Sequence, residues 1–361
     1  MEILDSIVIG AGQAGLSASY HLKRLGLRHV VLDANTAPGG AWQHRWDALT
    51  MRDVHGVAEL PDAMPPKLDL RRANVAVPES FADYEKEHEL PIIRPVNVTS
   101  VTDDAGTLLV HAAQNIWRAH TLINATGTWT RPFLPHYPGV ETFIGEQFHT
   151  VAYPGPEYFR NKRVLVVGGG ASAVQFLGAL RPITDTLWVT RTDPNWREDT
   201  FDSDEARIAA VALVEQRVAQ GLPPQSVVSV TGLALRAQEQ EAKDLGAYER
   251  HPMFTTVEAD GVRWADGRFE RIDAILWATG FRPAIAHLAP LKLRSDHGGI
   301  QLDRAGKGTG SVKDPRVQLV GYGPSASTIG ANRAGRSAAR GVKRNLDNFS
   351  QLGARPKILT R

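Results

Sequence analysis

The sequence predicts an α/β fold of two similar domains, with the second domain inserted into the first. A glycine pattern, G-x-G-x-x-G, occurs at Gly10–Gly15 and recurs with a final alanine at Gly168–Ala173, 158 residues later. Each copy follows a short apolar run and precedes a helix-forming segment, which is the strand–turn–helix order of a Rossmann-like dinucleotide-binding unit. A further apolar run, Val317–Val320, follows the second unit and is expected to return the chain to the first domain.

The first unit begins with a buried parallel strand over Ser6–Ile9, an apolar run that ends in glycine. A helix should follow and stop at Gly26. Its buried face is expected to hold the apolar residues Ala14, Ala18, Leu22 and Leu25. A second strand over His29–Leu32 then leads into Asp33 and completes a β–α–β unit.

The second unit repeats this plan with a strand over Arg163–Val167, a helix over Ala171–Leu180 and a strand over Leu187–Thr190. The following stretch, Asp199–Glu249, is rich in charges and helix formers and is broken at Gly221–Pro224. We interpret this stretch as two surface helices inside the second domain.

Two matching segments indicate where the chain passes between the domains. Leu122–Gly127 and Ile275–Gly280 are apolar runs that end in Ala-Thr-Gly, and an Arg-Pro pair follows each. We interpret them as exits from the two domains, with hinges near Tyr153–Arg160 and Gly280–Pro283. The expected division is residues 1–155 and 283–361 for the first domain and 156–282 for the second.

The glycine patterns predict where a dinucleotide pyrophosphate binds, because a glycine turn admits the phosphates closely and the helix N-terminus supplies free N–H groups. In the first domain the expected contacts are Gly10, Gly12, Gln13, Ala14 and Gly15. In the second domain they are Gly168, Gly170, Ala171 and Ser172.

The residue that ends the second strand of each unit carries a different charge. Asp33 and Arg191 each stand 23 residues after the first glycine of their pattern. Asp33 can accept hydrogen bonds from ribose hydroxyls and would repel a 2′-phosphate, so the first domain should hold FAD or NAD. Arg191 offers paired donors to a phosphate and Thr192 a hydroxyl, which favours NADPH in the second. Two different dinucleotides on one chain imply electron transfer between them.

Composition excludes several classes of function. The chain has 361 residues, a formal net charge of +2 and no cysteine. Disulfides, thiolate metal sites and a redox-active dithiol are therefore excluded, and we expect no metal, nucleic-acid or membrane partner. No apolar run could span a bilayer and no signal peptide begins the chain, so we expect a cytoplasmic protein. We interpret an arginine-rich stretch over Arg333–Arg344 as a solvated helix face.

The segment between the two units carries a family signature. Phe143–Tyr153 reads F-x-G-x-x-x-H-x-x-x-Y, just before the second glycine pattern. Together with Pro38–Trp42 and Trp277–Pro283, it resembles the flavin-containing monooxygenases and their Baeyer–Villiger relatives, and the short length resembles the bacterial branch. We expect His149 within this signature to be a hinge or interface residue rather than a proton donor.

The resemblance implies an FAD domain and an inserted NADP domain. NADPH would reduce the flavin, and oxygen would then form a flavin C4a-hydroperoxide that oxygenates sulfides, amines or ketones. The implied flavin contacts are Gly40, Trp42, Ala125, Thr126, Gly127 and Gly321, with Ala278 and Thr279 on the NADP side. A homodimer is the family expectation.

The catalytic candidates are Arg52 and Asp53. Many relatives place an asparagine in this region, whereas Leu49–His55 contains none, and Arg52 is the best positional match. Either residue could contact the flavin or the nicotinamide, or the two could pair at the rim. The departure leaves an NADPH oxidase open as an alternative, beside a reductase of a quinone or a redox protein and a non-catalytic redox sensor.

Overall fold

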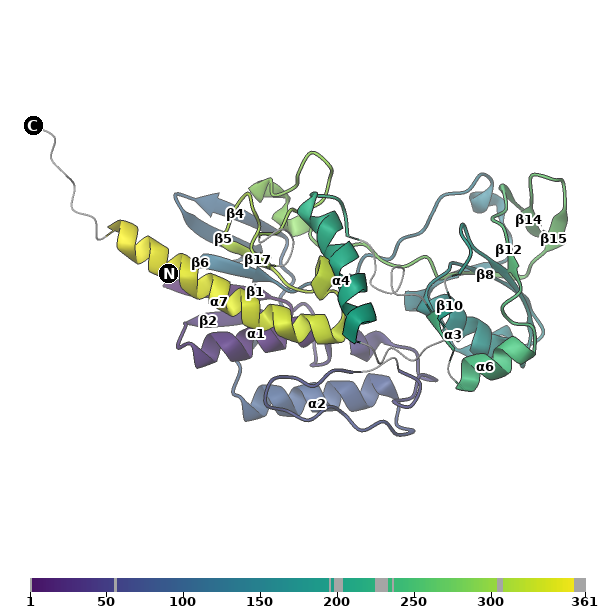
Figure 1. Ribbon diagram of the computed structural model, residues 1–361, viewed down its shortest axis with the longest axis horizontal. Helices are drawn as coiled ribbons and strands as arrows, with labels where there is room; N and C mark the ends of the chain where they lie inside the picture. Colours follow the sequence, from purple (N-terminus) through teal and green to yellow (C-terminus); the bar gives the residue numbers. More distant parts are fainter. Residues whose placement is uncertain are drawn as a thin grey trace, which may run out of the picture.

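The structure is a computed structural model that describes residues 2–54, 57–194, 196–197, 204–224, 233–235, 237–303 and 308–353. These residues form two lobes, each built on a mainly parallel sheet with helices packed against it (Figure 1). His55, the last residue of the segment compared above, lies outside the described residues. The predicted α/β fold with two dinucleotide-binding units is confirmed.

The first lobe holds a seven-stranded sheet in the order β3-β2-β1-β6-β5-β4, with β17 paired to the end of β6. Its strands are β1 (Ile3–Ile9), β2 (His29–Leu32), β3 (Ile92–Ile93), β4 (Ser100–Asp104), β5 (Thr107–Ala112), β6 (Asn115–Asn124) and β17 (Val317–Leu319). The helices of this lobe include α1 (Gln13–Arg24), α2 (Ala73–Glu87) and α7 (Thr328–Gly353), with 3-10 turns at η1 (Gly40–His44), η5 (Ala286–Leu291) and η7 (Gly323–Ser325). Strands β1, β2, β6 and β17 run parallel, so their carboxyl ends meet at one edge.

The second lobe holds a parallel sheet in the order β12-β9-β8-β16-β7. Its strands are β7 (Glu146–His149), β8 (Arg163–Val167), β9 (Asp185–Val189), β12 (Arg250–His251) and β16 (Ala274–Trp277). Shorter strands are β10 (Trp196–Arg197), β11 (Leu233–Ala234), β13 (Thr256–Glu258), β14 (Gly261–Arg263) and β15 (Phe269–Arg271). Its helices and 3-10 turns are α3 (Ala171–Leu180), α6 (Ala237–Asp244), η2 (Val140–Thr142), η3 (Thr150–Ala152) and η4 (Pro156–Phe159), and the helix α4 (Asp204–Ala219) lies between α3 and α6 in the sequence.

Most predicted elements are present at the predicted places. The strand–helix–strand order of both units is confirmed, and β17 returns the chain to the first sheet as expected. The buried face of α1 differs at one position, because Leu25 follows the helix and is 41% exposed. Among the described residues, no helix is long and apolar enough to cross a membrane.

The first crossing between the lobes lies earlier than predicted. β7 pairs with β16 in the second sheet, and Tyr153 and Phe159 pack in the core of the second lobe. The predicted hinge near Tyr153–Arg160 is therefore wrong, because these residues already follow a strand of the second lobe. The chain crosses at residues 127–133, next to the return segment 280–284, as the paired Ala-Thr-Gly exits indicated.

The helix α4 packs on the first lobe, although the sequence placed both helices of this stretch in the second domain (Figure 1). Val218 is fully buried in a core cluster of the first lobe, and a Cβ on Gly323 would lie 2.7 Å from its Cγ2. The Gln301 side chain donates to the carbonyl of Ala219 (2.8 Å), and Gly299 N–H donates to Gly221 (2.9 Å). By contrast, α6 packs against α3 in the second lobe, as expected.

Replacing Val218 by alanine should lower the free energy of unfolding by about 1–3 kcal/mol, because two buried methyl groups are lost and a cavity forms. Leu213 on the same helix is 54% exposed, so Leu213→Ala should change the free energy of unfolding by less than about 0.5 kcal/mol. Chemical unfolding of both variants measures the difference. Equal effects would contradict the packing of α4 on the first lobe.

Candidate functional site

The glycines of the first pattern have distinct structural roles. A Cβ on Gly15 would lie 1.9 Å from the carbonyl oxygen of Gly10, and Gly10 itself has φ +100° and contacts Ala125. These two glycines let β1, α1 and the end of β6 approach closely. At Gly12 a Cβ would meet its nearest neighbour only at 4.0 Å, the Cα of Gly40. Gly12 therefore leaves open the space that a pyrophosphate would need.

The structure brings the predicted flavin contacts together at the carboxyl edge of the first sheet. A Cβ on Gly40 would lie 2.8 Å from the Cα of Gly12, and one on Gly321 would lie 3.9 Å from the Cα of Gly127. Trp42 is half-buried in the turn η1 that Gly40 begins. The predicted contacts at the glycine pattern, the Gly40 turn, the end of β6 and Gly321 thus lie close together at this edge of the sheet.

The N-terminus of α1 faces the same edge. The first hydrogen bond closing the helix runs from Leu16 N–H to the Gly12 carbonyl (2.9 Å). The N–H groups of Gln13, Ala14 and Gly15 precede it and have no acceptor within the helix, as in helix-terminal anion sites. The Gln13 side chain donates to the Ala58 carbonyl (2.7 Å), so it positions the segment beside the helix.

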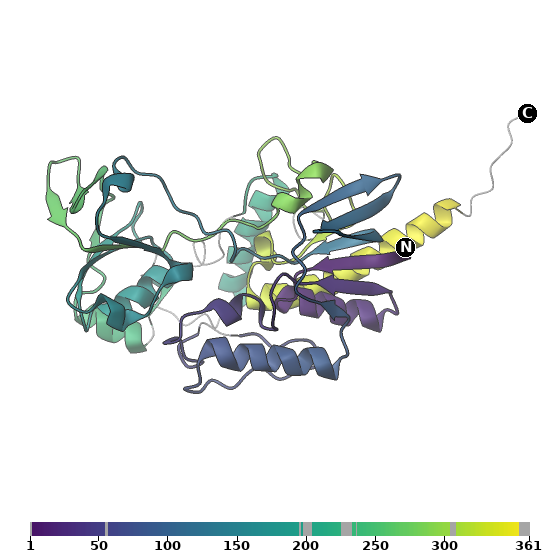
Figure 2. The same ribbon diagram turned by 180° about the vertical axis from the view of Figure 1, so that it is seen from behind.

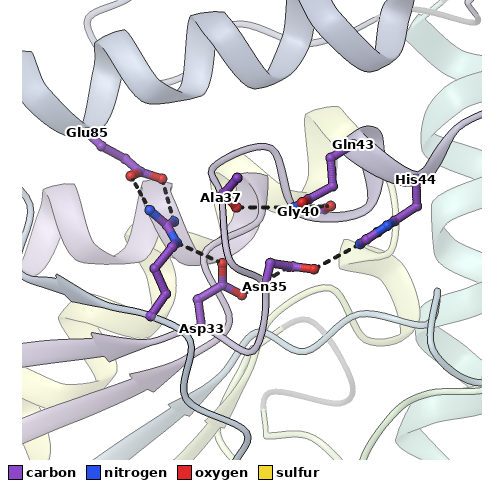
Figure 3. Close-up of polar contacts among 8 residues, drawn as sticks. Asp33, Asn35, Ala37, Gly40, Gln43, His44 and Glu85 are labelled. Carbon is purple, nitrogen blue, oxygen red and sulfur yellow. Dashed lines mark hydrogen bonds and ion pairs between the residues drawn. The ribbon is translucent and has the colours of Figure 1, made fainter.

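Asp33 follows β2 in a buried polar chain (Figure 3). Its Oδ2 accepts from Arg94 Nε (3.3 Å), and its Oδ1 accepts from the Asn35 side chain (3.2 Å). The two terminal nitrogens of Arg94 bind the Glu85 carboxylate at 2.7 and 2.8 Å. The series of hydrogen bonds continues from the Asn35 side chain to the His44 ring (2.8 Å), so the loop between β2 and η1 is held in place (Figure 3). Sequence reasoning missed Arg94 and Glu85, since nothing local marks them as partners of Asp33.

The second glycine pattern repeats the division of roles. Gly168 has φ +136°, and a Cβ there would lie 2.2 Å from the carbonyl oxygen of Ala278 at the end of β16. A Cβ on Gly170 would meet nothing within 4 Å. The first helical hydrogen bonds run from Ala173 and Val174 to Gly170, which leaves the N–H groups of Ala171 and Ser172 facing outward from the helix N-terminus.

The register of the two units differs by one residue. Gly10 N–H bonds to Leu32, and Gly168 N–H bonds to Val189. The structural equivalent of Asp33 is therefore Thr190. The sequence prediction that Arg191 occupies the position equivalent to Asp33 is wrong, although both residues stand 23 residues after the first glycine of their pattern. The segment from the first glycine to the end of the second strand is one residue shorter in the second unit, from Gly168 to Val189, than in the first, from Gly10 to Leu32, which moves Arg191 one place beyond. Arg191 and Thr192 are both exposed.

A second arginine, Arg250 of β12, lies beside this end of β9. Its Nε donates to the Thr190 hydroxyl (3.0 Å), Nη2 donates to the Thr190 carbonyl (3.2 Å), and Nη1 pairs with Asp193 (2.8 Å). Arg250 thus supports the turn that carries Arg191 and Thr192. No sequence pattern marks Arg250, because β12 is only two residues long and follows a charged stretch.

The threonines of the two Ala-Thr-Gly segments bond to the opposite crossing segment. Thr126 Oγ1 donates to the Ala284 carbonyl (2.7 Å), and Thr279 Oγ1 donates to the Phe133 carbonyl. Their hydroxyls are therefore used to join the two crossings.

The signature segment connects the lobes through aromatic contacts. Tyr153 lies edge-on to Trp46 (5.6 Å between ring centroids), and Trp46 also contacts Phe176 of α3 (5.3 Å). His149 is buried, with Nδ1 accepting from Val151 N–H and Nε2 donating to the Gly280 carbonyl (3.0 Å). Burial lowers the His149 pKa below its ordinary value, although the bond to Gly280 opposes this shift. The contacts of His149 support its interpretation as an interface residue.

The catalytic candidates lie in a loop that touches both lobes. The Asp53 carbonyl accepts from the Gln175 side chain of α3 (3.5 Å), and its carboxylate accepts from the Thr50 hydroxyl. Arg52 is exposed, with its N–H bonded to the Asp69 carbonyl (2.9 Å). Among the described residues, no ion pair joins Arg52 to Asp53. Their catalytic role stays a prediction.

Arg45, which the sequence did not single out, lies between two tryptophans beside this loop. Its guanidinium carbon is 4.3 Å from the ring centroid of Trp129 and 5.4 Å from that of Trp42. Burial lowers the Arg45 pKa to about 10, which leaves it charged at neutral pH. Trp129 in turn stacks on Phe281 (5.2 Å), so the Gly40 turn and both crossings meet at this cation. Within the described part of the chain, no group of histidine and carboxylate side chains could hold a metal ion.

Alanine at Gly168 and at Gly170 should have opposite effects. Gly168→Ala should destabilise the fold, because the Cβ would overlap the Ala278 carbonyl in a left-handed backbone conformation. Gly170→Ala should keep the thermal unfolding temperature but weaken NADPH binding, since only a bound dinucleotide fills that space. Calorimetry and NADPH titration of both variants check this. A destabilised Gly170→Ala with normal NADPH affinity would contradict the assignment.

Known proteins resemble the chain over most of its length. Residues 7–310 match the family model described as pyridine nucleotide-disulphide oxidoreductase. A flavin-containing monooxygenase from Stenotrophomonas maltophilia is 34% identical, with 96% of this chain and 100% of that chain covered and a TM-score of 0.81. A flavin monooxygenase mutant from the same organism superposes with a TM-score of 0.83 at the same identity and coverage.

Curated relatives match more partially. A probable indole-3-pyruvate monooxygenase of Arabidopsis thaliana is 31% identical over 47% of this chain and 42% of its own length. A Baeyer–Villiger monooxygenase of Pseudomonas aeruginosa is 24% identical over 76% of this chain and 63% of its own length. The chain spans about half the length of the Bacillus and Geobacillus oxidoreductases it matches, 50–59%. On the family-model match and the Stenotrophomonas similarity, the chain belongs to the pyridine nucleotide-disulphide oxidoreductase family and, within it, to the flavin-containing monooxygenases.

Proposed function

We propose that this protein is an FAD-dependent, NADPH-using monooxygenase. The observation that carries the proposal is the pair of open glycine cradles, at Gly12 and at Gly170, on two sheets joined by paired crossings. Both cradles have helix N-termini with free N–H groups, which fits two pyrophosphates on one chain. The family description names a disulphide, but the chain has no cysteine to form one as an electron acceptor, and molecular oxygen is the acceptor we propose.

The residues of the first lobe fit FAD. Gly12, Gln13 and Ala14 would hold the pyrophosphate, and Asp33 would accept from the ribose of the adenosine. Asp33 is charge-compensated by Arg94 yet keeps lone pairs free, because Arg94 and Asn35 use only part of the carboxylate. Gly40, Trp42, Ala125–Gly127 and Gly321 would line the path of the flavin. When bound, FAD supplies hydride acceptance and oxygen activation, while the chain orients it and excludes water.

The residues of the second lobe fit NADPH. Ala171 and Ser172 would bind the pyrophosphate, and Arg191 with Thr192 would bind the 2′-phosphate. The Stenotrophomonas mutant named above carries adjacent arginine and threonine in place of glutamine and histidine, the same dipeptide that this chain has at Arg191–Thr192. Arg250 would hold Thr190 and Asp193 so that Arg191 points to the phosphate rather than to Asp193.

The proposed substrates are sulfides, amines and ketones. The names of the relatives include Baeyer–Villiger and indole-3-pyruvate monooxygenases, which supports a carbonyl compound beside the soft nucleophiles. In the balanced reaction, one oxygen atom enters the substrate and the other leaves as water, while NADPH supplies two electrons and solvent one proton. Arg52 and Asp53 stay our proposed catalytic contacts, because their loop joins the flavin lobe to α3 of the NADP lobe.

Arg191→Gln should weaken NADPH binding by about one to two decades and leave NADH nearly unchanged, because a paired phosphate contact is worth roughly 1.5–3 kcal/mol. Binding of both nucleotides to the FAD-loaded protein is measured by titration. The control is Arg181→Gln, a charge loss on the same lobe away from the β9 turn. Equal loss for NADPH and NADH would make Arg191 structural.

Coupled turnover tests the function directly. With methyl phenyl sulfide, the FAD-loaded protein should consume NADPH and oxygen in equal amounts and form the sulfoxide in proportion. Hydrogen peroxide without sulfoxide would reduce the function to an NADPH oxidase, which the lack of asparagine in Leu49–Val54 favours as the second candidate. Turnover with a quinone but not with oxygen would make it a reductase, and a bound flavin that NADPH never bleaches would make it a redox sensor.

A further inference from the structure

A cavity of about 880 Å³ lies outside both nucleotide cradles. Residues of α1, of α7 and of the segment 59–64 line it. The helices α1 and α7 pack side by side (Figure 2). The cavity is lined from α1 by Tyr20, His21, Arg24 and Leu25, and from α7 by Asn332, Arg333, Arg336 and Arg340. None of the residues assigned above to FAD or NADPH lines it, because it borders the later turns of α1 rather than its N-terminus.

The cavity concentrates unpaired positive charge. Arg333, Arg336 and Arg340 are spaced so that they follow one face of α7 over about 10 Å. Among the described residues, none of the three makes an ion pair. Arg24 faces them from α1 and pairs with Asp62 (3.4 Å). Two carboxylates, Asp62 and Glu59, also line the cavity, and Tyr20 donates to Asp62 as well.

Positive potential also acts on the histidine of the cavity wall. The pKa of His21 is lowered to about 4, first by burial and then by the charges of Arg336, Arg24 and Arg340. His21 is therefore neutral at pH 7 and adds no further charge. Arg24, Arg336 and Arg340 all line the cavity together with His21, so their positive potential acts at its wall.

Part of the cavity wall is apolar. Leu25, Leu60, Pro61, Ala63 and Met64 line it. Met64 is 84% exposed and Leu25 is 41% exposed, so this wall is available to a ligand. The volume of the cavity lies in the range of small-molecule sites, about 300–1,000 Å³. A ligand that contacts both the arginines and the apolar residues carries several negative charges and an apolar or aromatic body.

We propose that this cavity binds an organic phosphate of the nucleoside polyphosphate class, at a site separate from those of FAD and NADPH. The planar guanidinium groups match phosphate oxygens in pairs, and three of them in a row match a chain of linked phosphates. The apolar wall receives the base. The arginine-rich stretch is thus a binding surface rather than only a solvated helix face, and this inference is independent of the proposed monooxygenase activity.

The test uses the FAD-loaded protein with saturating NADP⁺, so that both dinucleotide sites are filled, and ATP as the probe in calorimetric titration. ATP should bind saturably, more weakly at higher salt, and more tightly than pyrophosphate, which lacks the apolar contact. Arg336→Gln should weaken ATP about tenfold or more. The matched control is Arg344→Gln, an exposed arginine of α7 outside the cavity, which should change ATP affinity less than about twofold.

Several outcomes would overturn the proposal. They are no saturable ATP binding at millimolar concentration, equal losses in Arg336→Gln and Arg344→Gln, or binding that NADP⁺ abolishes. Arg336-dependent sedimentation with phosphatidylglycerol vesicles, without ATP binding, would assign the surface to a membrane instead. If Arg336→Gln unfolds, Arg336→Lys keeps the charge and should still weaken ATP severalfold through the lost paired geometry.

Discussion

The two segments in which the chain crosses between the lobes, 127–133 and 280–284, are hydrogen-bonded to each other, and the relative placement of the two nucleotide cradles depends on this pairing. Phe133 N–H bonds to Gly280, Arg282 N–H bonds to Arg131, and Ala284 N–H bonds to Gly127. The hydroxyl of each Ala-Thr-Gly threonine adds a bond to the opposite crossing. Because the segments come from the ends of β6 and β16, the carboxyl edges of both sheets are brought to one junction.

Side chains from both lobes cover this pairing and restrict its movement. Trp129 stacks on Phe281, and Arg45 lies over Trp129. The His149 ring bonds to the Gly280 carbonyl and lies edge-on to Phe281. The signature histidine thus fixes the second crossing, while the signature tyrosine, Tyr153, contacts Trp46. These contacts give the signature a physical role in joining the lobes, whichever residues perform the chemistry.

The two glycine patterns show how one local geometry serves both fold and binding. In each unit one glycine is required because a Cβ would overlap a carbonyl of the neighbouring strand end, at Ala125 or at Ala278. In each unit another glycine, Gly12 or Gly170, borders open space. The residues that follow the second strand of each unit differ between the two lobes. Asp33 is buried and held by hydrogen bonds, whereas Arg191 is exposed on a turn that Arg250 supports.

The sequence by itself determined the strand–helix–strand units, the glycine cradles, the exits at Ala-Thr-Gly and the lack of a dithiol. These features are local, because glycine requirements and apolar runs act within a few residues. Only the tertiary structure decided the partners of Asp33, the one-residue register shift at Arg191, the early crossing before β7 and the docking of α4 on the first lobe. It also decided that Arg24 and Arg336 face one cavity. Each of these depends on contacts between residues far apart in the chain, which pairing and packing select and which no local pattern encodes.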